Sequence, residues 1–276
     1  IMTFPNETLP KGRKQKTTAL YDRFINQGAV MGDSFGLENV LWFANNKNDA
    51  FENPTIKRSR SHDYVSKEVI NVRENVGLIE VANFSKHEFK GPDARKFLDH
   101  IMAGRLPKPG RISLSPMLSY RGKLCGDLTV ASFDENEFIV FGSGAAQEMH
   151  RRWFESHLGK FNLNYTNRSD EFHGLSIAGP NSRKVLEKIV RDDVSNEKFK
   201  FRDSRRMFVG GVPAIINRIS FTGELGYEIY VAPHYQIKLY EEIIEAGKEF
   251  NIKPFGGRAL MSMRLEKNWG AWTLDY

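Results

Sequence analysis

Apolar residues recur along this chain with two different periods, which predict alternating strands and helices. Short β-favouring runs predict buried strands, at residues 41–44, 77–81, 86–90 and 172–178. Apolar residues at helical spacing predict helices just before Gly28 and at residues 66–76, 91–102, 145–158, 179–190 and 235–250. Residues 1–18 and 45–62 lack such periodicity, so we expect an N-terminal arm and a loop there.

One pattern occurs twice. Residues 119–131 (SYRGKLCGDLTVA) align without a gap on residues 220–232 (SFTGELGYEIYVA). Each copy is typical of a glycine turn followed by a strand of period two. Asp127 and Glu228 are therefore expected at the same point of two related hairpins. They are either solvated charges at strand ends or two acids that converge on one ligand between the halves of the chain.

A second repeat indicates that a whole unit is duplicated. Residues 91–102 match residues 179–190 at an offset of 88, whereas the two hairpins are 101 residues apart, which suggests an insertion of 13 residues in the second half. The order strand, helix, hairpin, helix thus occurs twice and predicts an α+β fold with pseudo-twofold character. The expected division is an arm and first helix at residues 1–50, a first half at 51–165 and a second half at 166–276.

Composition narrows the class of protein. The chain is 40% hydrophobic and 27% charged, and it contains one cysteine, Cys125, so it has no internal disulfide and fits a reducing compartment. No apolar run approaches the roughly 20 residues of a membrane span. The net charge of +6 suits a small anionic ligand. Nucleic acid is disfavoured because most basic residues are dispersed among acids. The chain begins and ends as if it were a piece of a longer protein.

Familiar catalytic signatures are missing from the sequence. It contains no Walker A motif, no nucleophile elbow, no His-Glu-x-x-His pair and no dinucleotide-binding glycine pattern. Its seven histidines are scattered without the spacing of metal ligands. A metalloenzyme or a nucleotide hydrolase is therefore disfavoured, and no metal is predicted.

Acids, arginines and aromatic residues remain as candidates for a site. Asp127 and Glu228 can move a proton and accept paired hydrogen bonds from a heterocycle. Nearby aromatic residues can stack on such a ring: Tyr120, Phe221, Tyr227 and Tyr230.

Two arginines near the end of the chain add to this set. Arg258 and Arg264 are separated by about 120° around a helix, so one is expected at the ligand and the other in an internal pair with Glu266 or Glu228. Trp269 and Trp272 follow them. Each tryptophan is either a core or interface residue or a ligand contact.

Four stretches in order resemble the tetrahydrofolate-binding aminomethyltransferase family, typified by the T-protein of the glycine cleavage system. They are residues 122–130, 178–180, 222–228 and 258–266. The N-terminal third, with Leu20-Tyr21-Asp22-Arg23, residues 28–32 and residues 41–44, is most similar to the folate-binding half of dimethylglycine and sarcosine dehydrogenases. The resemblance covers nearly the whole chain.

The resemblance implies a role for each candidate. Asp127 matches the catalytic aspartate beside the reactive folate nitrogens, and Glu228 matches the acid that holds the pterin ring, with Tyr227 nearby. Arg258 and Arg264 match an arginine pair of which one is expected near the folate or its anionic tail.

The sequence also departs from the family. The T-protein has two adjacent acids where this chain has Gly126 and Asp127, and an asparagine where Ser143 falls. Phe84 stands near the position of a methionine. The family's C-terminal barrel is absent after Tyr276.

The resemblance implies an enzyme that transfers a one-carbon unit to tetrahydrofolate and gives 5,10-methylenetetrahydrofolate. The donor is an aminomethyl-lipoyl group or a methylated amine, and in the latter case oxidation requires a flavoprotein domain or subunit elsewhere. Folate-dependent O- or S-demethylation and a non-catalytic folate-binding module are the alternatives. Neither a nucleic-acid nor a membrane partner is expected, and the expected location is the cytoplasm, or the mitochondrial matrix in a eukaryote.

Overall fold

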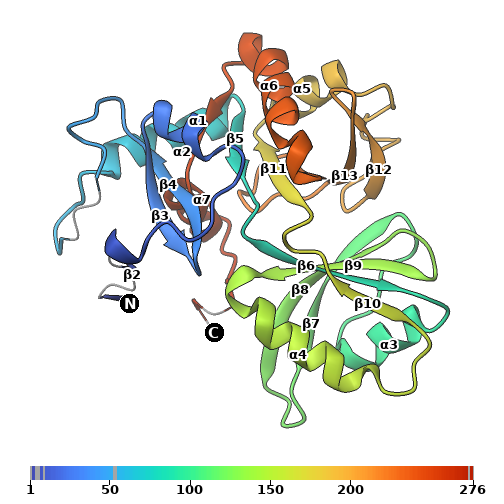
Figure 1. The fold of residues 1–276 in the computed structure, drawn as a ribbon. Coiled ribbons are helices and arrows are strands. Elements are labelled where there is room, and N and C mark those ends of the chain that lie inside the picture. The colour runs from blue at the N-terminus through green and yellow to red at the C-terminus, as the bar shows by residue number, and fades with distance from the viewer. Residues whose placement is uncertain (1, 4–6, 9, 52–54, 273, 276) are drawn as a thin grey trace.

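The computed structural model describes residues 2–3, 7–8, 10–51, 55–272 and 274–275. Within these residues, two main sheets and a third group of elements from both ends of the chain make up the molecule (Figure 1). The predicted arm at residues 1–18 lies partly outside the described residues. No helix in the described part is long and apolar enough to cross a membrane.

The first sheet has the strand order β10-β6-β9-β8-β7, and all its pairs are antiparallel. Its strands are β6 (Phe84–Lys90), β7 (Arg111–Leu118), β8 (Leu124–Ser132), β9 (Glu137–Ser143) and β10 (Asn164–Asn167). Helices α3 (Ala94–Ile101) and α4 (Gln147–Leu158) cover one face. Phe97 and Phe154 of these helices belong to one buried cluster with Leu128 and Val130 of β8.

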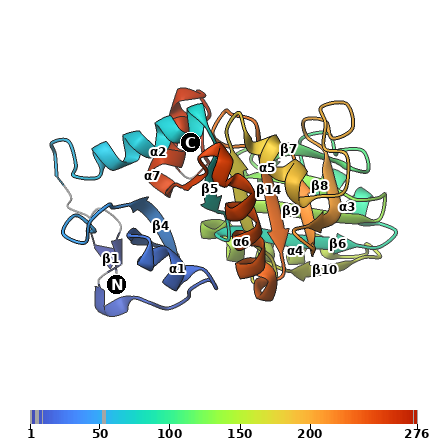
Figure 2. The ribbon, with the colours of Figure 1, turned by 90° about the horizontal axis from the view of Figure 1, so that it is seen from above.

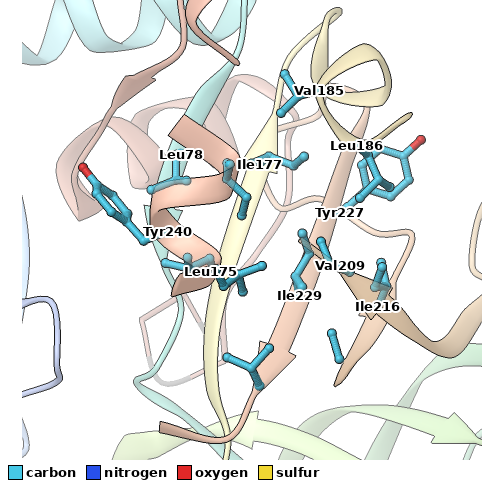
Figure 3. Close-up of a cluster of buried hydrophobic side chains, with 14 of the residues drawn as sticks. Leu78, Leu175, Ile177, Val185, Leu186, Val209, Ile216, Tyr227, Ile229 and Tyr240 are labelled. Carbon is cyan, nitrogen blue, oxygen red and sulfur yellow. The ribbon is translucent and has the colours of Figure 1, made fainter. Parts of the chain in front are cut away.

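The second sheet has the strand order β12-β13-β14-β11-β5-β15. Its strands are β5 (Gly77–Glu80), β11 (His173–Ala178), β12 (Ser204–Val209), β13 (Val212–Asn217), β14 (Gly226–Val231) and β15 (Lys253–Pro254). Helices α5 (Ser182–Ile189) and α6 (Gln236–Gly247) pack on its outer face. Figure 3 shows this core, in which Leu186 and Tyr240 of the helices lie over Leu175, Ile177 and Ile229.

Each half lends one strand to the sheet of the other half. Strand β5 leads directly into β6 but pairs with β11, and β10 leads directly into β11 but pairs with β6. The chain therefore crosses between the sheets twice, at residues 81–83 and 168–172. At both crossings the backbone itself links the first sheet to the second.

The predicted duplication is confirmed, with three strands rather than one hairpin between the helices. The units β6-α3-β7-β8-β9-α4 and β11-α5-β12-β13-β14-α6 have the same sheet order. Helix α5 starts 182 − 94 = 88 residues after α3, β13 starts 212 − 124 = 88 after β8, and β14 starts 226 − 137 = 89 after β9. The offset is nearly constant, so the expected insertion of 13 residues is wrong.

The hairpin alignment misled because it matched the glycine turn before β8, at Gly122, with the glycine turn before β14, at Gly223. By strand order, β8 corresponds to β13 and β9 to β14. Asp127 therefore lies in the strand that corresponds to β13, whereas Glu228 lies in the strand that corresponds to β9. The two acids do not occupy equivalent positions, and each half supplies one of them.

The third group joins both ends of the chain (Figure 2). It contains α1 (Tyr21–Asn26), the hairpin β3 (Ala29–Ser34) and β4 (Leu37–Phe43), α2 (His62–Glu74) and α7 (Gly257–Glu266). The carboxylate of Glu68 in α2 accepts hydrogen bonds from the backbone N–H groups of Phe43 (2.7 Å) and Gly256 (3.0 Å). Burial raises the pKa of Glu68 to about 7.

The remaining elements are short. They are the pair β1 (Met2–Thr3) and β2 (Glu7–Thr8) and the 3-10 turns η1 (Pro10–Gly12), η2 (Gly144–Ala146), η3 (Pro233–Tyr235) and η4 (Lys248–Phe250).

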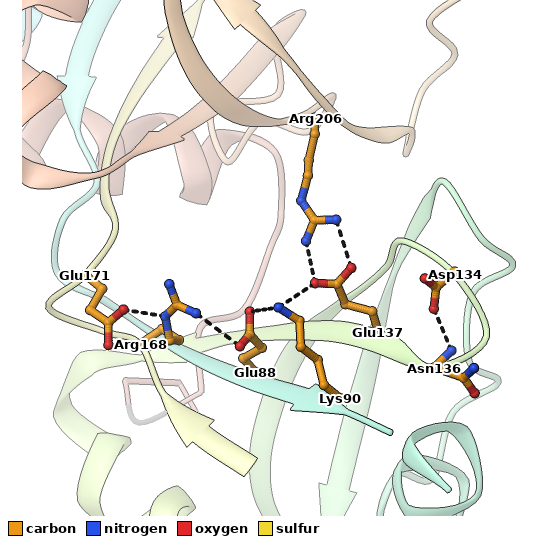
Figure 4. A network of polar contacts seen from close by, with 8 residues as sticks. All are labelled: Glu88, Lys90, Asp134, Asn136, Glu137, Arg168, Glu171 and Arg206. Atoms are coloured by element: carbon orange, nitrogen blue, oxygen red, sulfur yellow. Dashed lines mark hydrogen bonds and ion pairs between the residues drawn. The ribbon is translucent and has the colours of Figure 1, made fainter. Parts of the chain in front are cut away.

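Away from the crossings, ion pairs join the two halves (Figure 4). Arg206 of β12 donates two hydrogen bonds to Glu137 of β9, at 2.8 and 2.7 Å. Lys90 of β6 also contacts Glu137, at 2.8 Å. The bidentate pair with Arg206 is the main reason why the pKa of Glu137 is lowered to about 2, and Lys90 adds to the effect.

We predict that Glu137→Gln destabilises the protein at neutral pH and that the difference from wild type disappears in acid. Because its pKa is lower in the folded state than the ordinary value of 4.5, the carboxylate stabilises the fold above pH 4.5, and this stabilisation is lost as the pH falls toward 2. We expect a loss on the order of 1–2 kcal/mol at pH 7, reduced by the solvent around Arg206. Urea unfolding of the variant and of wild type at pH 7 and at pH 2 measures the difference.

Glu155→Gln is the control, because Glu155 makes an exposed pair with Arg151 within α4. Its effect should stay below about 0.5 kcal/mol. Equal losses for the two variants would show that the pair between Glu137 and Arg206 adds nothing to the junction.

Candidate functional site

Strand alternation points Asp127 and Glu228 toward the junction between the sheets. Asp127 shares a face of β8 with Ala131, and Glu228 shares a face of β14 with Tyr230. Ala131 and Tyr230 belong to one buried cluster, which we call the inter-sheet cluster; it consists of Val72, Ile79, Val81, Ile112, Ala131, Ile139, Phe141, Ala178, Ile215, Tyr230, Phe255, Ala259 and Met263. The acids therefore lie on facing surfaces of the two halves.

An aromatic contact connects these surfaces. The rings of Phe141 in β9 and Tyr230 in β14 are 4.7 Å apart. Phe141 pairs with Thr129, two residues after Asp127. The hydroxyl of Tyr230 donates a hydrogen bond of 2.9 Å to Oε2 of Glu228. Both acidic side chains remain partly exposed, so both keep contact with solvent at the junction.

The two carboxyl groups have different surroundings. In the described part of the chain, the side chain of Asp127 makes no hydrogen bond or ion pair, and burial alone raises the pKa of its carboxyl group. Burial also raises the pKa of Glu228, to about 7, although the Tyr230 hydroxyl and the charge of Lys86 both oppose this rise. Asp127 is suited to take up and release a proton, and Glu228 is held in place.

Two buried polar residues beside Glu228 were not among the candidates from sequence. Asn217 is paired with Glu228 across the strands, and its Nδ2 atom is buried without a hydrogen-bond partner in the described residues. Lys86 is fully buried and lies 5.8 Å from the centre of the Tyr230 ring. The alternation of Phe84, Lys86 and Glu88 along β6 places Lys86 on this face, whereas no local pattern singles out Asn217.

Lys86 also connects the two crossings. Its ammonium group donates hydrogen bonds to the backbone carbonyl of Ala82 in the first crossing (2.9 Å) and of Ser169 in the second (3.4 Å). Burial lowers the pKa of Lys86 to about 7. The junction is therefore built around a lysine that is only partly charged at neutral pH.

Phe84 and Ser143 lie on the same face as Phe141. They form the last pair between β6 and β9, and Phe84 packs against the inter-sheet cluster. Phe84 also lines a cavity of about 60 Å³ with Lys16, Asp170 and Gln147. Asp127 and Glu228 do not line this cavity.

The arginines of α7 differ in burial, as their spacing predicts. Arg258 is exposed, and Arg264 is 5% exposed. Arg264 forms an ion pair with Asp275 and donates a hydrogen bond to the carbonyl of Trp269 at 3.1 Å. The expected internal partner was wrong, because Glu266 pairs with Arg73 (2.6 Å) instead.

Trp272 lies near the strand that carries Asp127. Its ring stacks on His150 of α4 at 5.4 Å. His150 in turn contacts the carbonyl of Cys125, two residues before Asp127. Trp272 thus stays a candidate for a ligand contact.

Tyr120 and Tyr227 lie apart from this set. Tyr120 is 87% exposed and contacts His157 on the outside of α4. Tyr227 points into the opposite face of its sheet, where Arg183 donates a hydrogen bond to its hydroxyl at 3.1 Å. Period-two alternation already implies this, since neighbours in a strand face opposite ways. Tyr230 is the tyrosine on the side of Glu228.

The fold and these residues define a domain of two similar α+β halves with an acid on each facing surface. The chain belongs to the GCVT N-terminal domain family, whose sequence model matches residues 20–276. The resemblance inferred from the motifs is thereby confirmed.

The relatives include a dehydrogenase, an aminomethyltransferase and a sarcosine oxidase subunit. The chain is 36% identical to mitochondrial dimethylglycine dehydrogenase of Mus musculus, over 99% of this chain and 32% of that protein. It is 31% identical to aminomethyltransferase of Thermoanaerobacter pseudethanolicus, over 71% of this chain and 53% of that protein. With sarcosine oxidase subunit alpha of Rhizobium meliloti it shares 30% identity over 91% of this chain and 25% of that subunit. The chain spans about a third of the length of the dehydrogenase.

The solved structure of glycine cleavage system aminomethyltransferase T from Bartonella henselae has the same fold. It superposes with a TM-score of 0.77 at 21% identity, over 93% of this chain and 64% of that one. The predicted α+β fold is confirmed. Neither main sheet closes into a barrel in the described residues.

We predict that Tyr230→Phe raises the pKa of Glu228 above about 7, because the hydroxyl that donates to the carboxylate is removed. Carboxyl ¹³C NMR with labelled glutamate measures the titration. Tyr227→Phe removes a hydroxyl from the same strand on the opposite face and should leave the Glu228 titration unchanged. Equal pKa values for Glu228 in wild type and Tyr230→Phe would remove Tyr230 as its hydrogen-bond donor.

Proposed function

We propose that this chain binds tetrahydrofolate at the junction of its two sheets and transfers a one-carbon unit to it, giving 5,10-methylenetetrahydrofolate. The observation that carries the proposal is the placement of Asp127 and Glu228 on facing surfaces, one without partners and one held by Tyr230. Membership of the GCVT family supports it.

The pterin ring offers paired N–H donors, which a carboxylate can accept side by side. Glu228 fits this role because Tyr230 contacts Oε2, while Oε1 has no hydrogen-bond partner in the described residues. Phe84, which is only partly buried, offers apolar surface on the same face as Phe141. Arg258 is exposed on α7 and suits the anionic folate tail, whereas Arg264 is 5% exposed.

Asp127 is the proposed catalytic residue. In the reaction with an oxidised donor, an iminium, two N–H bonds of the folate are replaced by two bonds to the transferred carbon. Both bonds between that carbon and the donor nitrogen break, and the donor amine departs. The amine takes one of the two protons, and Asp127 accepts the other. Its raised pKa suits this step, because a group that titrates closer to neutral pH is a better proton acceptor.

The names of the relatives favour a methylated amine as the source of the carbon. Dimethylglycine dehydrogenase and sarcosine oxidase both oxidise N-methylated glycines. Their alignments cover 99% and 91% of this chain, respectively. We therefore propose that a flavoprotein domain or subunit supplies the oxidised donor. The mitochondrial name of the relatives favours the matrix over the cytoplasm.

We predict that Asp127→Asn lowers kcat for one-carbon transfer by about 10²–10⁴-fold and leaves the dissociation constant for tetrahydrofolate nearly unchanged. The amide keeps the shape of the side chain but cannot accept the proton. Transfer is followed as methylenetetrahydrofolate formed from dimethylglycine or sarcosine in the full-length protein, and binding is followed by calorimetry.

Thr129→Val is the matched control on the same face of β8, and its kcat should stay within a few-fold of wild type. Unchanged turnover in Asp127→Asn would remove Asp127 from the mechanism. Folate binding by wild type without transfer from any donor would favour a non-catalytic binding module.

We predict that folate affinity falls as the pH drops below about 7. The ligand needs the carboxylate form of Glu228, whose pKa is raised to about 7. Below that pH a proton must leave before binding, at a cost of up to about tenfold in affinity per pH unit. Glu228→Gln should bind more weakly at pH 8 and lose the pH dependence, whereas Glu224→Gln, at the ion pair with Arg73, should keep it. A pH-independent wild type would exclude Glu228 as the pterin anchor.

A further inference from the structure

Strands β8 and β9 separate at the residue that carries the proposed chemistry. They are paired from Ser132 opposite Phe138 to Thr129 opposite Phe141, and no further. Strand β9 then continues alongside β6 to Ser143. If the pairing between β8 and β9 went on in register, Asp127 would lie opposite Ser143. The end of β8 that carries Asp127 therefore has no strand on that side.

The opposite edge of this segment is also irregular. Strand β7 pairs with β8 along its length, but the register shifts between Met117 and Leu118, next to Gly126 and Leu124. The backbone around Asp127 is thus held by one irregular ladder.

His150 of α4 lies behind this segment, on the face opposite Asp127, and is fully buried. Its Nε2 atom lies 3.1 Å from the carbonyl oxygen of Cys125. A Cβ atom on Gly126 would stand 3.0 Å from Nε2, and one on Gly142 would stand 3.3 Å from Nδ1. The imidazole therefore spans the two separated strands, and the two glycines leave room for it.

The position of the proton on His150 follows from its partner. A carbonyl oxygen only accepts, so Nε2 carries the hydrogen and donates it to Cys125. Burial lowers the pKa of His150, which keeps the ring neutral with Nδ1 unprotonated. Rings of His87, Phe154 and Trp272 surround it. The ring is held in one orientation, with its donor aimed at β8.

We propose that His150 is a positioning residue for Asp127: its hydrogen bond to the Cys125 carbonyl replaces the missing strand contact and fixes the backbone that presents the carboxyl group. The inference rests on the proposed function only where it predicts a loss of kcat for one-carbon transfer. The structural part, that His150 holds this end of β8, stands by itself.

Three variants separate the hydrogen bond from simple packing. In His150→Gln the side-chain amide nitrogen reaches about as far as Nε2 and keeps a donor for Cys125. In His150→Met the volume is similar but the donor is lost. His87→Met is the packing control, because His87 is buried beside His150, with ring centres 6.3 Å apart, but is bonded to Tyr165 rather than to β8.

The first readout is independent of any activity. In His150→Met we expect amide hydrogen exchange at residues 124–127 to accelerate at least about tenfold, because the segment opens locally. The pKa of Asp127, measured by carboxyl ¹³C NMR, should fall toward its ordinary value as water reaches it. His150→Gln and His87→Met should show neither change.

The second readout is transfer by the full-length protein. His150→Met should lose kcat on the order of 10–100-fold, the usual cost of a misplaced catalytic group, with an unchanged dissociation constant for tetrahydrofolate. His150→Gln should regain kcat to within a few-fold of wild type. If His150→Gln is no better than His150→Met, or if His87→Met has the same effects on residues 124–127, His150 acts only by packing and the inference is overturned. If exchange and pKa respond as expected but wild type transfers no one-carbon unit, the proposed function fails and the positioning of Asp127 stands.

Discussion

The exchange of strands β5 and β10 between the halves is the constraint on which the rest of the structure depends. Each strand continues directly into a strand of the other sheet, so the two crossings keep the sheets face to face where the chain passes between them. Lys86 lies at this point and bonds to a carbonyl of each crossing. Because these contacts fix which faces are opposed, they also decide which side chains of β8 and β14 point into the junction.

The two halves of the duplicated unit carry their acids on different strands of the repeat. Asp127 lies in β8, which corresponds to β13, and Glu228 lies in β14, which corresponds to β9. Ile215 of β13 and Ile139 of β9 are buried in the inter-sheet cluster. The two acids therefore have different surroundings and need not perform the same task. A symmetric pair of close carboxylates would instead share a proton and couple their titrations.

Local patterns in the sequence predicted most helices and strands, because amphipathic periods reflect burial by neighbours on one face. The repeated pattern singled out Asp127 and Glu228, and the resemblance to the aminomethyltransferase family implied a role for each. The strand exchange could not be predicted, since the apolar run of β5 indicates burial but not which strand it pairs with. His150 was missed because its contact, the carbonyl of Cys125, lies 25 residues away in sequence. Asn217 was missed because it meets Glu228 only through the pairing of β13 with β14. Tyr227 was expected near the ligand, although strand alternation already places it on the face opposite Glu228 and places Tyr230 on the same face as Glu228.

Burial alone does not identify the functional acid, because Glu68, Glu80 and Glu228 all have pKa values raised to about 7. Their hydrogen bonds distinguish them. Both oxygens of Glu68 accept backbone N–H groups, and Glu80 accepts from Gln236 and is 6% exposed. Glu68 and Glu80 thus accept hydrogen bonds from other residues of the fold. Glu228 accepts from one donor among the described residues, Tyr230, and keeps exposed surface. A ligand that offers N–H groups can therefore reach the second oxygen of Glu228 and replace water there, whereas the oxygens of Glu68 already have donors from the fold.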